Sequence, residues 1–395
     1  MKFAGVTDRL ARLGSHKWAL HDRAKQMAAE GRDVIRLTVG EPDLPTPPEL
    51  VATLTGALAR GRTGYSSGRG EAGLLLALAK KYTRRCHREI APRNILAFPG
   101  TQTALYAVMM ALAEAGTEVL VGDPNYATYE GVIRATGATP VPVPLRPERG
   151  FRLDAADVAA RVTPRARVLL LNSPHNPTGA VLTAQDIRAL GDLARARDLW
   201  IVSDEVYEEL IFDAPFASPL DFADLAERTV VASSISKSHA APGFRSGWCV
   251  GSAEFCARLL PLSETMLFGN QPFIADMTAA ALNGPSAVAA ELRARLSRRA
   301  DLVVEALDGC AGLAVSRPEA GMFAMLDVRA TGLGGFDFAS SLLDATGVAV
   351  MPGCSFGESL RGWCRVSLTV EDARLAEAMV RIADFAAESG RRKIA

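Results

Sequence analysis

One stretch decides the fold of this chain: Thr229-Val230-Val231-Ala232-Ser233-Ser234-Ile235-Ser236-Lys237, in which an apolar, strand-like run ends in a lysine. Lys237 stands among hydroxyls and small residues, with no carboxylate within seven positions on either side. An ammonium group near a packed interior loses solvation, so its neutral amine becomes accessible and can attack a carbonyl to form a Schiff base. Arg245 follows with a fixed charge of the kind that holds a phosphate. The stretch predicts a lysine bound to a phosphorylated aldehyde.

Strand-like runs alternate with helical segments from residue 95 onward. Runs such as Val168-Leu169-Leu170-Leu171 are short and apolar without alternation. Short buried strands separated by helices predict an α/β fold, a mainly parallel seven-stranded sheet sandwiched by helices. Ligands of such sheets bind beyond the carboxyl ends of the strands, where the polar clusters of this chain fall. The strand-like runs are 95–98, 118–121, 139–143, 167–172, 199–204, 229–232 and 247–251, and the helical segments are 102–115, 126–136, 183–197 and 254–260.

The pattern predicts two further parts of the chain on either side of this large domain, which spans 48–285. After residue 285, an Arg-rich helical region leads into three strand-like runs and two helices, which predicts a smaller α+β domain over 286–395. Residues 1–47 form an N-terminal arm that joins the small domain, with a helix over 16–31 and a strand over 34–39.

Composition excludes several classes of protein. The 44 basic and 44 acidic residues cancel, so no global field attracts nucleic acid. The six cysteines are scattered without a Cys-x-x-Cys pair, which disfavours a disulfide scaffold or a zinc site and fits a reducing, cytoplasmic setting. No signal peptide or apolar run of membrane-spanning length is visible, which predicts a soluble protein that makes no membrane contact.

The predicted strand ends carry residues that suit a pyridoxal phosphate site. Gly100-Thr101-Gln102 joins a strand to a helix, so its backbone N–H groups could receive a phosphate, although an ordinary helix cap is the simpler interpretation. Asp204 follows a buried run and could keep a pyridine nitrogen protonated. Tyr207 and Asn176 could donate to the phenolic oxygen of the ring, or could be a core tyrosine and an Asn-Pro turn.

Three motifs carry a resemblance to a known family. Asn176-Pro177-Thr178-Gly179, Ser203-Asp204-Glu205-Val206-Tyr207 and Ser234-Ile235-Ser236-Lys237 with Arg245 resemble the class I/II aminotransferases, which are pyridoxal-phosphate-dependent enzymes of fold type I and include the aspartate aminotransferases. The resemblance runs from Gly40-Glu41-Pro42-Asp43 to Arg365. It implies an enzyme that moves an amino group between an L-amino acid and a 2-oxo acid in two half-reactions.

The resemblance also implies roles for individual residues. Lys237 would form the Schiff base with pyridoxal 5′-phosphate and shuttle a proton, with Asp204 and Tyr207 as its catalytic partners. Tyr126 would stack on the ring, and Arg365 would clamp the substrate carboxylate. Tyr65 would reach the site of a neighbouring subunit, which implies a homodimer. The other implied cofactor contacts are Gly100, Thr101, Gln102, Asn176, Ser234 and Arg245, and the other substrate contacts are Asn176 and Gly40.

The substrate and the reaction type are less constrained. The segment Met266-Leu267-Phe268-Gly269-Asn270-Gln271-Pro272-Phe273 departs from the Ser/Thr-rich pattern of many relatives and looks similar to arginine–pyruvate transaminases. An aspartate, aromatic or arginine–pyruvate type of substrate therefore stays open. A C–S β-lyase or decarboxylase also stays open, because these enzymes share the electron sink. A serine hydrolase built on Ser355 is disfavoured, since all five histidines precede that residue.

Overall fold

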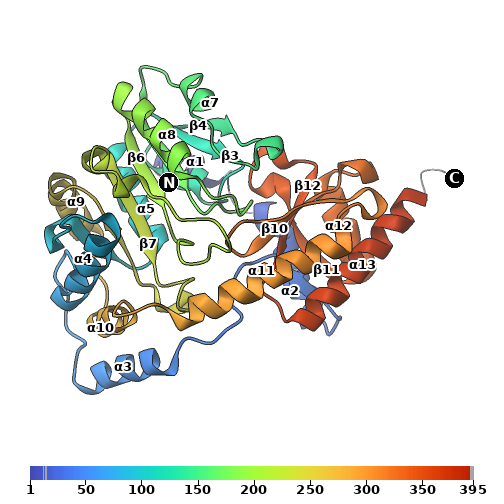
Figure 1. Ribbon diagram of the computed structural model, residues 1–395, viewed down its shortest axis with the longest axis horizontal. Helices are drawn as coiled ribbons and strands as arrows, with labels where there is room; N and C mark the ends of the chain where they lie inside the picture. The colour runs from blue at the N-terminus through green and yellow to red at the C-terminus, as the bar shows by residue number, and fades with distance from the viewer. Residues whose placement is uncertain (12, 14–15, 392–395) are drawn as a thin grey trace.

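The computed structural model describes residues 1–11, 13 and 16–391 of the chain. Over this part of the chain, the larger of two sheets contains seven strands in the order β2-β8-β7-β6-β5-β3-β4 (Figure 1). Neighbouring strands run parallel except at β8, which is antiparallel to both β2 and β7. The predicted sheet is therefore confirmed. Its strands are β2 (Ile95–Phe98), β3 (Glu118–Asp123), β4 (Thr139–Pro144), β5 (Ala166–Asn172), β6 (Trp200–Asp204), β7 (Thr229–Ser234) and β8 (Gly247–Val250).

Helices cover both faces of this sheet because its central strands are apolar on both sides. In β5, Val168 and Leu170 pack into the core on one face, and Leu169 and Leu171 pack into the core on the other. Helices α5, α6 and α9 complete the first core, α8 completes the second, and α4 and α10 pack into a third core. The helices of this part are α3 (Pro48–Ala59), α4 (Ala72–Cys86), α5 (Thr101–Leu112), α6 (Tyr129–Ala135), α7 (Ala155–Ala159), α8 (Ala184–Ala196), α9 (Ala253–Met266) and α10 (Pro272–Ala281).

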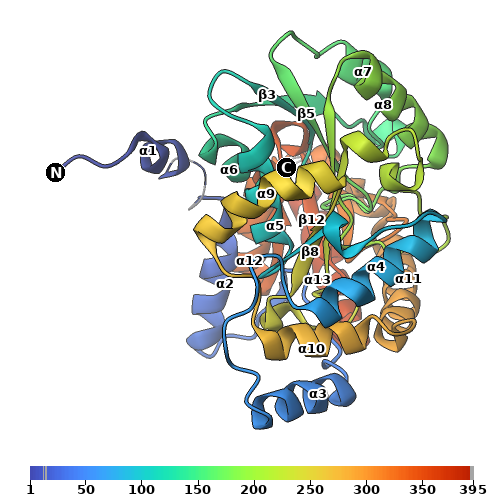
Figure 2. The same cartoon turned by 90° about the vertical axis from the view of Figure 1, so that its left-hand side faces the viewer.

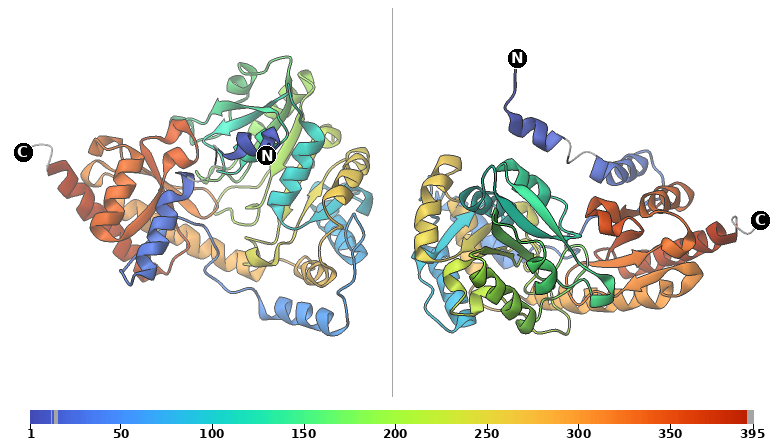
Figure 3. Two further views of the ribbon diagram at one scale, coloured as in Figure 1. Left: turned by 180° about the vertical axis from the view of Figure 1, so that it is seen from behind. Right: turned by 90° about the horizontal axis from the view of Figure 1, so that it is seen from above.

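A smaller mixed sheet lies beside the first, with the order β1-β11-β12-β10-β9 over the described chain. Strand β1 of the N-terminal arm pairs in parallel with β11, so the arm is built into this sheet. The long helix α11 runs from the large sheet to the small one, and α2 packs on the small sheet from the opposite side (Figures 1 and 3). The domain boundaries at 47/48 and 285/286 stay predictions. The elements are α2 (Ala19–Ala29), β1 (Ile35–Leu37), α11 (Ala287–Leu307), β9 (Ala314–Ser316), β10 (Phe323–Asp327), α12 (Gly335–Thr346), β11 (Val348–Pro352), β12 (Trp363–Ser367) and α13 (Asp372–Arg391).

Several helices differ from the prediction, which did not include α1 (Gly5–Ala11), α7 or α10. The helix expected over 16–31 is a short 3-10 turn, His16–Trp18, followed by α2. Helix α4 was missed, because the Gly-rich segment before it reads as loop. The helix predicted over 254–260 continues to Met266, because α9 accommodates Pro261 in its interior.

The N-terminal helix α1 (Gly5–Ala11) projects from the body of the molecule (Figure 2). None of its residues is buried, and its side-chain contact with the body is a hydrogen bond from Arg9 Nε to the carbonyl oxygen of Arg134 at 3.0 Å. Within residues 1–11, 13 and 16–391, no helix combines the length and the apolar character needed to span a membrane.

Three strand ends meet at one edge of the large sheet. Asn172 at the end of β5 is in register with Asp204 at the end of β6, and Asp204 is in register with Ala232 of β7. Because these strands are parallel neighbours, their carboxyl ends deliver side chains to the same place. Lys237 follows β7 directly and joins this cluster.

Candidate active site

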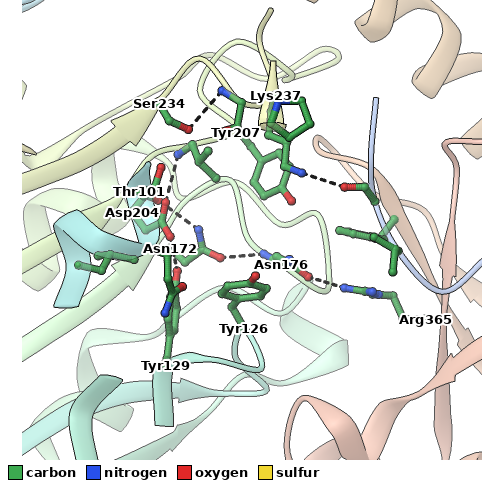
Figure 4. A pocket seen from close by; sticks show the side chains of 18 of the residues that line it. Thr101, Tyr126, Tyr129, Asn172, Asn176, Asp204, Tyr207, Ser234, Lys237 and Arg365 are labelled. Atoms are coloured by element: carbon green, nitrogen blue, oxygen red, sulfur yellow. Dashed lines mark hydrogen bonds between the residues drawn. The ribbon is translucent and has the colours of Figure 1, made fainter. Parts of the chain in front are cut away.

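A pocket with a volume of about 230 Å³ lies at this edge, between the two sheets (Figure 4). The structure brings together in its lining most of the residues predicted for the site. Gly100 immediately precedes the pocket residue Thr101, whereas Tyr65 lies outside the pocket of its own chain. The predicted residues that line the pocket are Gly40, Thr101, Gln102, Tyr126, Asn176, Asp204, Tyr207, Ser234, Lys237, Arg245 and Arg365.

Lys237 is half-buried and lines the pocket. Its Nζ donates a hydrogen bond to the carbonyl oxygen of Gly40 at 2.8 Å, across the space between the two sheets (Figure 4). Burial lowers the pKa of the Lys237 amine to about 8, and the charges of Arg365 and Arg245 lower it as well, against the opposing pull of Glu41. A useful fraction of this amine is therefore neutral near pH 8 and able to act as a nucleophile or base.

Asp204 is a buried carboxylate without a cationic partner among the described residues. Its Oδ2 accepts a hydrogen bond from the Tyr129 hydroxyl at 2.7 Å, and its Oδ1 accepts one from the backbone N–H of Val206 at 3.2 Å. Burial raises the pKa of Asp204 to about 6, while these two donors lower it. A cationic group placed against this carboxylate would relieve the cost of its burial.

Tyr129 is a site residue that the sequence prediction missed. Its hydroxyl donates to the ionised form of Asp204, so replacing Tyr129 by Phe should raise the pKa of Asp204 further above its usual value. We expect Tyr129→Phe to bind pyridoxal phosphate about tenfold more weakly near pH 6, because a hydrogen bond to a charged group is lost. The difference should shrink at higher pH, where Asp204 is ionised in both proteins. Titration of the cofactor-free proteins across this pH range measures it, and identical pH dependence would contradict the role.

Asn172 ties two parts of the pocket together and was also missed. Its Nδ2 donates to the carbonyl oxygens of Pro174 and Asp204, each at 3.1 Å, and its Oδ1 accepts from the backbone N–H of Asn176 at 2.8 Å (Figure 4). One amide therefore fixes Asn176 relative to the end of β6. The turn itself contains cis peptide bonds before Pro174 and Pro177.

Asn176, Tyr207 and Tyr126 crowd one side of the pocket. Burial raises the pKa of Tyr207 well above its ordinary value, so its hydroxyl keeps its proton and remains a donor. Tyr126 packs against Tyr129 edge to face, with ring centroids 5.5 Å apart and an interplanar angle of 82°. The pair presents an aromatic wall to the cavity.

A second cluster lies at the start of α5. Thr101 Oγ1 is buried and has no hydrogen-bond partner among the residues described. Gly100 precedes it with a φ of 89°, and a Cβ at this position would lie 2.2 Å from Arg245 Nη2, so glycine is required for the close approach. Ser234 and Gln102 line the same end of the pocket. An orphaned hydroxyl, a helix N-terminus and a guanidinium are groups that suit an anion.

Arg365 enters the pocket from β12 of the small sheet. It is 2% exposed, and it lies between the rings of Phe323 and Phe356, with its guanidinium carbon 3.7 Å and 4.3 Å from the two centroids. Its Nη1 donates to Asn176 Oδ1 at 3.0 Å and its Nη2 to the carbonyl oxygen of Thr38 at 2.5 Å. The Nε of Arg365 is buried and has no hydrogen-bond partner in the described chain. Burial lowers the pKa of the Arg365 guanidinium. The group is poised to bind an anion.

Tyr65 does not contribute to the pocket formed by its own chain. Its side chain is 95% exposed, and its ring packs against Phe268, which is 61% exposed, with centroids 5.9 Å apart. Two large aromatic rings thus face solvent together.

Comparisons with known proteins converge on one family. The sequence model described as aminotransferase class I and II matches residues 32–382. The chain is 43% identical over 388 residues to an arginine–pyruvate transaminase of Pseudomonas aeruginosa, covering 98% of this chain and 99% of that protein. It is 35% identical over 399 residues to an aspartate/prephenate aminotransferase of Cereibacter sphaeroides, covering 97% and 99%. The solved structure of the Thermus thermophilus aspartate aminotransferase with maleate superposes with a TM-score of 0.92 at 30% identity, covering 98% of this chain and 100% of that one.

Proposed function

The chain belongs to the class I and II aminotransferases, and from this premise we propose that it moves the amino group of L-arginine to pyruvate. It is an enzyme that transfers amino groups, and its family depends on pyridoxal 5′-phosphate (PLP). The family, the fold and the cofactor predicted from the sequence are confirmed. The residue roles, the substrate, the assembly and the location below are proposals.

The residues of the pocket fit PLP at three points. The buried Asp204 carboxylate suits a protonated pyridine nitrogen. The unpaired Thr101 hydroxyl and the Arg245 guanidinium suit the phosphate, with Gly100, Gln102 and Ser234 around it. Lys237 suits the aldehyde, because burial keeps part of its amine neutral. Asn176 and Tyr207 would donate to the ring oxygen, and Tyr126 would stack on the ring.

The protein's own groups divide the work of the reaction. When bound, PLP supplies an electron sink that stabilises a carbanion at the substrate Cα. Asp204 would hold the ring nitrogen in its protonated form, and Lys237 Nζ would remove the proton from Cα as a base. Arg365 orients the substrate by binding its α-carboxylate, and the carbonyl of Gly40 aims the amine of Lys237.

The substrate proposal rests on the cationic side chains that line the pocket. Among the described residues of the lining, the cations are Lys237, Arg245 and Arg365, and each already has a proposed role. The second carboxylate of aspartate would therefore need a cation that this lining does not supply. The similarity over nearly the whole chain to an arginine–pyruvate transaminase supports arginine as the amino donor.

A single-turnover panel tests this proposal. The purified holoenzyme is mixed separately with arginine, aspartate and phenylalanine without an oxo acid, and the visible absorption of the bound cofactor is followed. We expect arginine to shift the spectrum fastest, and added pyruvate to restore it. Faster conversion by aspartate or phenylalanine would refute the proposed specificity while leaving the family assignment intact. The relatives compared here carry names of amino-transferring enzymes, so these comparisons do not favour a β-lyase.

We also propose a homodimer in which Tyr65 reaches the site of the other subunit. Tyr65 and Phe268 form a tilted aromatic pair, with an interplanar angle of 60°, that faces solvent in the single chain. Other exposed apolar side chains lie on α3, α5 and α9, namely Val51, Leu58, Met110 and Met266. Apolar surface of this kind typically marks an interface.

Mixing two inactive variants tests the shared site. Lys237→Ala removes the amine of a chain's own site, whereas Tyr65→Ala would damage the site of the partner. In a mixed dimer one site carries both changes and the other carries neither. Random reassembly of equal amounts makes half of the dimers mixed, so about one quarter of the sites should be intact. Recovery of about one quarter of the wild-type activity supports the proposal, and no recovery above the two homodimers contradicts it.

A cytoplasmic location is the last proposal. All six cysteines are free thiols in the part of the chain that the structure describes, and four of them are buried. Unpaired thiols of this number fit a reducing compartment.

A further inference from the structure

We propose that Trp18 selects a cationic substrate side chain by stacking its indole ring against the guanidinium group. This inference rests on the proposed arginine specificity and deepens it by assigning a residue to the recognition. Trp18 lies outside every motif that the sequence analysis singled out. It nevertheless lines the pocket, together with Val39 and Phe323 on the side of the small sheet.

The pocket lining offers no free carboxylate to the guanidinium group of a bound arginine substrate. Asp204 is the acidic side chain in the described lining, and its two oxygens already accept hydrogen bonds from Tyr129 and Val206. Asp204 is also one of the residues proposed to bind the cofactor, not the substrate side chain. A cation held at the substrate end of the pocket must therefore find another partner, and an aromatic face is the partner that the lining offers.

The indole of Trp18 is held in place by groups that lead to the carboxylate clamp. Its ring meets that of His21 at an interplanar angle of 77°, with centroids 6.0 Å apart. His21 Nδ1 is 2.8 Å from Thr38 Oγ1, and the carbonyl oxygen of Thr38 accepts a hydrogen bond from Arg365. The ring proposed for the substrate side chain is thus fixed relative to the guanidinium proposed for its α-carboxylate.

The segment that carries Trp18 is anchored on its other side as well. The carbonyl oxygen of Lys17 accepts a hydrogen bond from Ser355 Oγ at 3.0 Å, and Lys17 Nζ donates to Glu130 and to the carbonyl oxygen of Ala127, each at 3.4 Å. The indole packs in part against the apolar core beneath the large sheet. A preorganised ring of this kind loses little entropy when it binds a flat cation.

The experiment compares arginine with citrulline, which replaces the guanidinium by a neutral urea of nearly the same shape. The ratio of kcat/KM for the two substrates, with pyruvate as acceptor, isolates recognition of the charge. Trp18→Leu should lower this ratio by about 5- to 30-fold, which corresponds to the loss of a partly desolvated cation–π contact. Trp18→Phe keeps an aromatic face and should lower it less. Ser355→Ala loosens the anchoring of the segment without removing the ring, so it should lower the ratio less than Trp18→Leu does.

The outcomes separate this inference from the proposed function. Wild-type turnover of arginine reports on the proposed function, and the ratio in the variants reports on Trp18. If the wild type uses arginine and Trp18→Leu leaves the ratio unchanged, the inference is overturned alone. Glu41→Gln serves as the rival variant, because the negative charge of Glu41 raises the pKa of Lys237 and therefore acts on the pocket. A ratio that falls in Glu41→Gln and not in Trp18→Leu would assign the recognition to a salt bridge instead.

Discussion

Replacing Lys237 by Ala should lower kcat/KM for amino transfer by on the order of 10⁴-fold or more, because the variant loses the base as well as the amine that holds the cofactor. The visible absorption of the bound cofactor should change at the same time. The hydrogen bond from Lys237 to Gly40 spans the two sheets, so the variant also loses one contact between them. Absorption spectra and initial rates measure both effects.

Two further variants make this result specific. Lys237→Arg keeps a positive charge but cannot supply a neutral amine, since a guanidinium stays protonated in proteins. It should therefore be as inactive as Lys237→Ala. Lys80→Ala, on the exposed side of α4, should behave as the wild type. An active Lys237→Arg enzyme would show that the amine is not the base, and the proposed mechanism would be wrong.

Replacing Arg365 by Leu should lower kcat/KM by about 10²- to 10³-fold, because removing one partner of a buried charged pair costs about 2–5 kcal/mol. Most of the loss should appear in KM, while the absorption of the bound cofactor stays unchanged. Arg365→Lys should also be poor, since an ammonium reproduces neither the planar stacking between Phe323 and Phe356 nor the fork of donors.

A substrate analogue supplies the control for Arg365. Agmatine is arginine without its α-carboxylate, so it cannot use the proposed clamp. The wild type and Arg365→Leu should turn over agmatine at similarly low rates, although they differ strongly on arginine. An equal loss on both compounds would mean that Arg365 supports the fold of the pocket rather than the substrate, and unfolding curves of the two proteins would show this directly.

The large sheet could be predicted because its strands carry the information locally. Runs such as Val168-Leu169-Leu170-Leu171 are apolar on both faces, which marks a strand that is covered on both sides. The residues at the ends of these strands therefore converge by topology alone. The small sheet was harder, because β1 pairs with a strand from the far end of the chain, and nothing in the local pattern announces that pairing.

The pocket residues that the sequence prediction missed were missed for one reason. The contact of Tyr129 with Asp204 joins residues 75 positions apart, and spacing along the chain cannot reveal which hydroxyl closes that distance. One signal was available, because Tyr129 lies three residues after Tyr126 and shares its side of the turn. Arg299 gives a similar lesson: it lies in an Arg-rich helix, yet it is 2% exposed and bound to Asp43 and Asp372.

The two sheets supply different halves of the chemistry. The side chains proposed to face the cofactor come from the strands of the large sheet and the segments that follow them, whereas Trp18, Gly40 and Arg365 come from the arm and the small sheet. Substrate preference can therefore change through mutations in the arm and the small sheet without disturbing the binding of PLP. A protein engineer who wishes to retarget this catalyst should randomise the arm and leave the strand ends of the large sheet untouched.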